Sequence, residues 1–61
     1  MNNQFVLLHD ADDHEYPVWI NLALVMRIDE YRLGSKLQLV GNNQYFYAVE
    51  SPMDIMKLAK G

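Results

Sequence analysis

The shortness of the chain limits its fold more than any other feature of the sequence. Its 61 residues contain no cysteine, so disulfide bonds cannot reinforce the fold and thiolate chemistry is excluded. A domain of this size lies near the lower limit at which one hydrophobic core sustains a fold without a metal, disulfides or a partner. We therefore expect residues 1–61 to form a single small domain.

Composition indicates a folded protein that stays outside the membrane. Hydrophobic residues make up 51% of the chain and charged residues 21%, a balance typical of folded rather than disordered chains. The apolar run near the N-terminus, residues 5–8, is too short for a secretory signal or a membrane span. Together with the absence of cysteine, this predicts a cytoplasmic protein without membrane insertion.

Hydrophobic alternation and turn residues predict five strands. We expect them at residues 4–9, 15–20, about 25–31, 36–40 and 44–50, with a helical turn at residues 21–24 and a turn at residues 33–35. Pro17 lacks a backbone N–H, so the second strand should lie at a sheet edge or carry a bulge.

A single helix is expected at the C-terminus. Ser51 is a favourable N-cap, Pro52 suits the first helical position, and the acid Asp54 suits the first turn. The helix should run to about Lys60, with an apolar stripe that includes Ile55, Leu58 and Ala59. The fold class is therefore mostly β (α+β): a five-stranded antiparallel meander, curled or small barrel-like, with one C-terminal α-helix.

Three of the expected strands are apolar on both faces. An antiparallel strand with one face in water alternates apolar and polar residues, but residues 5–8, 16–20 and 45–49 do not. A helix of about ten residues, ~15 Å long, covers about two strands. We therefore expect aromatic surface to remain for a partner. The alternative is a tightly closed barrel that buries most of its aromatic side chains.

The register of the last hairpin decides which aromatic residues are exposed. If residues 42–43 form a two-residue loop, Tyr45 and Tyr47 face outward, while Phe46 and Ala48 face the core. A three-residue loop would turn the two tyrosines inward. We favour the first arrangement. The residues that we expect at a protein interface are Trp19, Tyr45, Tyr47, Tyr16 and Val40.

The segment HDADDHE, residues 9–15, raises the question of a metal site. Read from Asp10 as an EF-hand loop, it lacks the required glycine and the closing glutamate. His9 and His14 have no third histidine or cysteine with which to complete a zinc site. We expect a solvated acidic turn and no bound metal or cofactor. This acidic patch consists of Asp10, Asp12, Asp13 and Glu15. Residues 1–21 contain no Lys or Arg, so the net charge of −3 is concentrated in the first third of the chain.

No arrangement of residues indicates catalysis. The two serines, Ser35 and Ser51, are expected in a turn and a helix cap, and the chain has no threonine. Asp29 and Glu30 are adjacent on a strand, so their side chains point to opposite faces and cannot act as an acid–base pair. We expect a protein that is not an enzyme. Met53 and Met56 are expected to fill the core.

The second half of the chain contains a series of short motifs that occur together in a known family. They are Ile20-Asn21, Leu24-Val25, Arg27-Ile28-Asp29-Glu30, Leu37-x-Leu39, Gly41-Asn42, Tyr45 and Glu50-Ser51-x-x-Asp54-Ile55-Met56. Through these motifs the chain resembles the small FlbD-like flagellar and swarming-motility proteins of bacteria, over about forty of its 61 residues. The chain departs from that family at Leu22, where a proline is common, in a longer and more acidic first hairpin, and in an extra residue in the last strand. The resemblance implies a small non-enzymatic cytosolic protein that supports motility through protein contacts.

The function that we favour from the sequence is a protein–protein interaction module, homo-oligomeric or bound to another protein. One alternative is an acidic phage-type inhibitor or nucleic-acid mimic, whose carboxylates occupy a basic site on a host protein. Another is a small-barrel RNA binder that uses the tyrosines as stacking platforms beside Arg27, Arg32 and Lys36. The small number of basic residues disfavours binding to nucleic acid.

Overall fold

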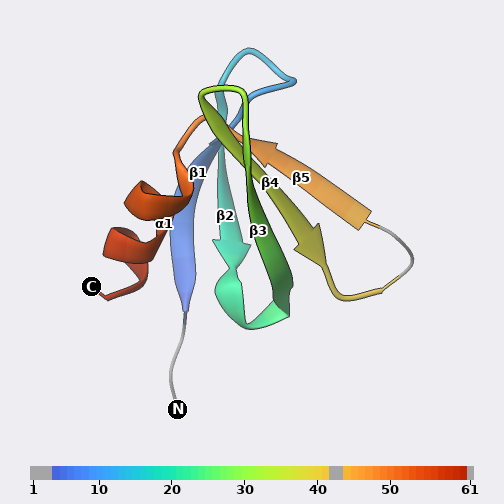
Figure 1. The fold of residues 1–61 in the computed structure, drawn as a ribbon, viewed down its shortest axis with the longest axis vertical. Helices are drawn as coiled ribbons and strands as arrows, with labels where there is room; N and C mark the ends of the chain where they lie inside the picture. Colours follow the sequence, from blue (N-terminus) through green and yellow to red (C-terminus); the bar gives the residue numbers. More distant parts are fainter. Residues whose placement is uncertain (1–3, 42–43, 61) are drawn as a thin grey trace.

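The computed structural model of the protein describes residues 4–41 and 44–60. Within them, five strands form one antiparallel sheet, and a short helix follows the last strand (Figure 1). The expected mostly-β fold with a C-terminal helix is confirmed. The elements are β1 (Phe5–Asp10), β2 (Tyr16–Asn21), the 3-10 turn η1 (Leu22–Leu24), β3 (Val25–Tyr31), β4 (Gly34–Leu39), β5 (Gln44–Ala48) and α1 (Pro52–Ala59).

The sheet is a curled meander that remains open. Its strand order is β2-β1-β5-β4-β3, so the last strand returns to the first, as it would in a barrel. That contact is short: Asp10 pairs with Ala48, and the N–H of Ala11 donates to the carbonyl of Tyr47 at 2.8 Å. Within the described residues, β2 and β3 are joined by η1 but are not paired with each other. The structure is therefore barrel-like in its curl without being closed.

The position of Pro17 in an edge strand confirms the prediction from its missing N–H. Pro17 lies in β2, which is one edge of the sheet, as its missing N–H requires. The other edge is β3, whose pairing with β4 is irregular between Val25 and Arg27 and regular from there to Tyr31.

The pairing of β4 with β5 confirms the outward direction that we favoured for the tyrosines. Leu37 pairs with Phe46 and Lys36 with Tyr47, so the leucine side faces the core and the tyrosine side faces outward. The register pairs Leu39 with Gln44. The connection is therefore longer than the two residues expected, and the expected turn at 42–43 lies outside the described residues.

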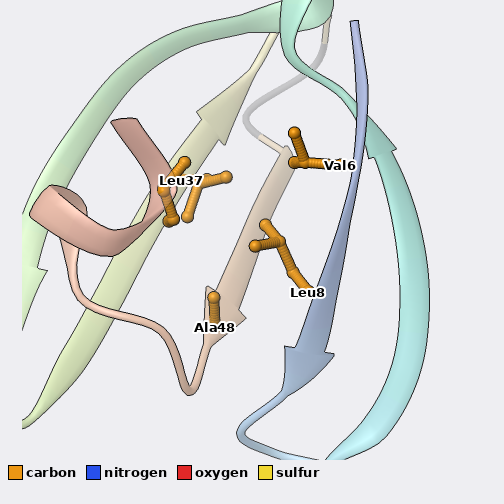
Figure 2. Close-up of a cluster of buried hydrophobic side chains, with 5 residues drawn as sticks. Val6, Leu8, Leu37 and Ala48 are labelled. Atoms are coloured by element: carbon orange, nitrogen blue, oxygen red, sulfur yellow. The ribbon is translucent and has the colours of Figure 1, made fainter. Parts of the chain in front are cut away.

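The core is small and comes from three strands and the helix. β1 and β4 contribute alternate side chains, as the period of a strand requires, and they point toward one another between the strands (Figure 2). Partly buried side chains of β2, β3 and η1 surround this centre. The buried hydrophobic residues are Val6, Leu8, Leu37, Ala48 and Ile55.

The helix begins as the sequence predicts. Ser51 Oγ accepts a hydrogen bond from the backbone N–H of Asp54 at 3.2 Å, which satisfies one of the unpaired donors of the first turn. The helix packs against β1 and β3 and lies beside β1 in Figure 1.

The buried face of the helix is narrower than the sequence predicts. Ile55 is fully buried, but Leu58 and Ala59 are exposed. Met53 and Met56 are 71% and 53% exposed, so the expectation that they fill the core is wrong. The reason is geometric: a helix of eight residues that crosses a curled sheet presses one turn into the core, and its other apolar side chains remain outside.

The backbones approach closely at the junction between β4, β5 and α1. A Cβ atom on Gly34 would lie 2.0 Å from the carbonyl oxygen of Ala48, which is far inside van der Waals contact. Next to it, the buried Ser35 donates a hydrogen bond from Oγ to the carbonyl of Glu50 at 2.7 Å. This region therefore tolerates only small side chains on β4.

Candidate protein-interaction surface

Large apolar side chains cover the outward side of β1 and β2. Val6 pairs with Ile20 in the register of these strands, and both pack into the core or against it. The alternate positions therefore point outward, where Leu7 pairs directly with Trp19. Phe5 follows on the same side of β1, since strand side chains alternate between the two faces.

These outward side chains continue into a hollow at the end of the sheet. The hollow has a volume of about 280 Å³ and is formed between β1, β2, η1 and the end of β4. Trp19 stands at its rim with 63% of its surface exposed. We name the exposed residues Phe5, Leu7, Trp19, Leu24 and Val40 the Trp19 surface.

The Trp19 surface consists of uncharged residues, and none of the described residues that line its hollow is charged. Single exposed apolar residues are common on soluble proteins, but contiguous ones mark contact sites. Aromatic residues are also enriched at the centres of interfaces, because a large rigid side chain loses little conformational freedom on binding. The Trp19 surface therefore has the composition of the centre of a protein interface.

Three tyrosines, on the outward side of β3 and β5, form a second group with cations of β4 and the β3–β4 turn. The rings of Tyr31 and Tyr47 are 5.0 Å apart between centroids and tilted by 51°. The Nζ atom of Lys36 lies 4.4 Å from the ring centroid of Tyr45, and the guanidinium of Arg32 lies 5.4 Å from that of Tyr31. These cations lie within the usual range for attraction to a ring face. Tyr31 and Tyr45 therefore each contact a cationic side chain of the same chain.

The structure thus divides the five residues that we expected at one interface. Trp19 and Val40 line the same hollow, whereas Tyr47 lines another with Tyr31. Tyr45 contacts Lys36. Tyr16, at the start of β2, is exposed and lines none of these hollows. The division results from the curl of the sheet, which turns the outward sides of β2 and β5 in different directions.

The acidic loop has a shape set mainly by its own backbone. The carbonyl of Asp10 accepts hydrogen bonds from the N–H groups of Asp13 and Glu15 at 3.2 and 2.9 Å. One carboxylate oxygen of Asp10 accepts from the N–H of Asp12 at 2.9 Å. His14 and Glu15 both have positive φ, at 52° and 57°. Among residues 4–41 and 44–60, no three potential ligand side chains gather where they could hold a metal ion.

The two histidines of the acidic segment differ in their surroundings. His14 is exposed in the loop. His9 instead contacts Glu50, with its Nδ1 2.6 Å from Glu50 Oε2 and its backbone N–H 3.0 Å from Glu50 Oε1. His9 therefore has a structural role at the junction before α1.

Comparison with known proteins gives no family. No protein-family model, no curated protein and no solved structure matches the chain. The resemblance to FlbD-like proteins accordingly stays a prediction from the sequence. The structure adds one exclusion for the part of the chain that it describes: α1 has eight residues, and no helix there has the length and apolar character of a membrane span.

Sequence reasoning missed a third apolar region, between β3 and α1. Met26 and Met56 line one hollow there, of about 390 Å³. Pro52 and Met53 line another beside it, and Ile28 contributes to both. The available signal was the short helix itself, because apolar residues at 53, 55, 56 and 58 cannot all face one core across two turns.

Proposed function

We propose that the protein acts through non-covalent protein–protein contact without catalysis, and that it self-associates through the Trp19 surface. The observation that carries the proposal is the exposure of Trp19 beside Leu7 and above an apolar hollow. Each large apolar side chain that a partner covers contributes about 1.5–3 kcal/mol relative to its exposed state.

The size of the core supports self-association. Five hydrophobic residues are buried in the described chain, which is little for a domain that lacks disulfides. A partner that binds only the folded state stabilises that state in proportion to its concentration. A second copy is always available at the concentration of the protein itself, so it meets this need directly.

The absence of charge on the Trp19 surface favours a second copy as its occupant. The chain carries a net charge of −3, so two copies repel wherever their acidic regions face one another. The described residues that line the hollow of the Trp19 surface carry no charge, so they add no such repulsion. Two copies can therefore meet there with their acidic loops kept in solvent.

Trp19 is the only tryptophan in the chain, so its fluorescence tests the proposal without a label. We expect its emission maximum to move to shorter wavelength as protein concentration rises, in step with a rise in sedimentation mass above 7.1 kDa. Trp19→Ser should self-associate more weakly than the wild type. Leu33→Ser is the matched control, since Leu33 is 96% exposed at the β3–β4 turn, away from the Trp19 surface. A monomeric mass and constant emission at all concentrations would contradict the proposal.

The resemblance to FlbD-like proteins suggests a role in bacterial motility, and we include this role in the proposal. A strain that lacks the gene should then swarm poorly on soft agar, and the wild-type gene should restore swarming. Restoration by the Trp19→Ser variant as well would separate motility from the Trp19 surface.

RNA binding is a second candidate because of the tyrosine group. Tyr31 and Tyr45 lie beside cations, and Tyr47 packs against Tyr31. Proteins that bind single-stranded nucleic acids combine aromatic rings for stacking with cations for charge neutralisation. However, Lys36 also pairs across the strands with Asp29, which reduces its attraction for phosphate. Anisotropy of a labelled single-stranded RNA should show salt-dependent binding that Tyr45→Ser weakens; no binding at low salt would exclude this candidate.

The acidic-inhibitor alternative rests on a loop that the structure leaves exposed. Residues 11–15 are all exposed, so the carboxylates of the loop can reach a basic surface on another protein. Replacement of the four acidic residues by their amides should then abolish binding to a basic partner, while the sedimentation mass of the protein alone should stay unchanged.

A further inference from the structure

The free edge of β3 is the feature that neither the core nor the Trp19 surface explains. β3 is the last strand of the sheet order, and within the described residues it pairs only with β4. The opposite edge, β2, contains Pro17, which cannot donate to an added strand. β3 contains no proline, so it is the edge that can accept one.

The turn between β3 and β4 shows which backbone groups point to that edge. Tyr31 and Gly34 flank a two-residue turn and pair with each other, and in such a hairpin the flanking pair exchanges its hydrogen bonds. Because hydrogen-bonded and non-hydrogen-bonded positions alternate, Asp29 bonds toward β4 as well. The N–H and C=O groups of Ile28 and Glu30 therefore point away from the sheet.

We propose that two copies of the protein pair along β3 as antiparallel strands. The twofold axis that relates them passes between Ile28 of one copy and Ile28 of the other. In this register Ile28 of one copy exchanges hydrogen bonds with Ile28 of the other. Arg27 of each copy then lies opposite Asp29 of the other. Because of the twofold symmetry, the interface contains two such Arg27–Asp29 pairs. These are non-hydrogen-bonded positions, where side chains approach most closely.

The charges of β3 select this register over its neighbours. An axis through Arg27 would place the two arginines opposite each other, and an axis through Asp29 would oppose the two aspartates. Like charges directly across strands are unfavourable, so both alternatives are disfavoured. Of these three registers, only the one centred on Ile28 places opposite charges across from each other. Within one chain Arg27 Nε already lies 3.1 Å from Asp29 Oδ1, which shows that the two side chains share the outward face.

The surroundings of the edge leave space for an added strand. Hollows of about 390 and 570 Å³ lie between β3 and α1, and Ile28 lines both. The exposed Met26, Met53 and Met56 border them. A second β3 lying along the edge would cover these methionines, whose flexible side chains adapt to a partner surface.

This contact shares the self-association proposed above but uses another surface, and a charge exchange tests it alone. Arg27→Asp gives a chain with two acids in the register, and Asp29→Arg gives a chain with two bases. Neither should pair with itself through β3, and we expect a loss of about tenfold or more in self-affinity. A mixture of the two should form one-to-one pairs, and the double variant R27D/D29R should pair with itself.

The measurement is native mass spectrometry of each chain and of the mixture, all in the Trp19→Ser background. That background removes the Trp19 surface, so pairing in the mixture supports the β3 contact even if Trp19 proves to have no role. Circular dichroism of each variant verifies that it folds. Self-pairing of the single variants at the affinity of their Trp19→Ser parent, or the absence of pairs in the mixture, would overturn the inference.

Discussion

His9 Nδ1 lies 2.6 Å from Glu50 Oε2, and the backbone N–H of His9 donates to the other oxygen of the same carboxylate. The contact ties β1 to the segment between β5 and α1, across 41 residues of sequence. Burial by itself raises the pKa of the Glu50 carboxyl, but the hydrogen bonds from the His9 side chain and backbone outweigh it and lower that pKa overall.

The lowered pKa of Glu50 predicts a loss of stability in acid. The unfolded chain takes up the proton near pH 4.5, the ordinary value, whereas the folded chain takes it up at lower pH. The contribution of Glu50 is therefore complete above pH 4.5 and disappears as pH falls through the pKa of the folded state. Urea denaturation at a series of pH values should show this decline.

Glu50→Gln should lower the free energy of unfolding by about 1–2 kcal/mol at neutral pH, since one partner of a charged hydrogen bond is lost at a partly exposed site. It should also flatten the decline in acid. Asp13→Asn is the matched control, because Asp13 is exposed in the β1–β2 loop. An equal flattening in both variants would assign the acid sensitivity to net charge instead.

Gly34→Ala should prevent or severely weaken folding. The added Cβ would lie 2.0 Å from the carbonyl oxygen of Ala48, so β4 and β5 would have to separate. Overpacking against rigid backbone costs about 3 kcal/mol or more, a large part of the total stability of a domain this small. Thermal melting by circular dichroism measures the effect. Leu33→Ala, at an exposed position one residue away, should change stability by less than about 0.5 kcal/mol.

Ile55→Ala should detach the helix from the sheet. Ile55 is the fully buried residue of α1, and truncation of such a side chain costs about 2–5 kcal/mol. Leu58→Ala, on the same helix but half exposed, should cost under about 1 kcal/mol. Chemical denaturation of both variants tests the difference. Equal losses would mean that the helix packs through a wider face than the structure shows.

Ser51→Ala should destabilise the protein by about 1 kcal/mol through loss of the helix N-cap. Ser51 Oγ accepts from the N–H of Asp54, and alanine offers no acceptor in its place. Ser51→Asp keeps an acceptor and adds favourable charge at the N-terminal end of the helix, so it should retain wild-type stability. Urea midpoints of the two variants provide the comparison.

The local elements of this fold were predictable because their causes are local. The alternation in β4 and β5 and the capping sequence Ser51-Pro52 each specify a conformation through neighbours within a few residues. The structure confirms these elements within a residue or two at their ends. The apolar pattern also predicted that β2 has large side chains on both faces, and Trp19 is exposed while its neighbour Ile20 packs against the core.

The errors arose where several elements meet. The methionines of α1 were expected in the core, because apolar residues on a helix usually face one. The structure leaves Met53 and Met56 exposed, since a two-turn helix across a curled sheet has room for one buried side chain. The link between His9 and Glu50 was also missed, because no local pattern joins residues that only the curl of the sheet brings together.

The sequence by itself determined the strands, the helix start and the excess of apolar surface, since these depend on side-chain type and on spacing along the chain. Among residues 4–41 and 44–60, the tertiary structure alone decided that β2 and β3 stay unpaired and that β3 presents a free edge. It also decided that Trp19 and Tyr47 line different hollows. The physical reason is the curl of the sheet, which sets the distances between strands remote in sequence and which no single strand encodes.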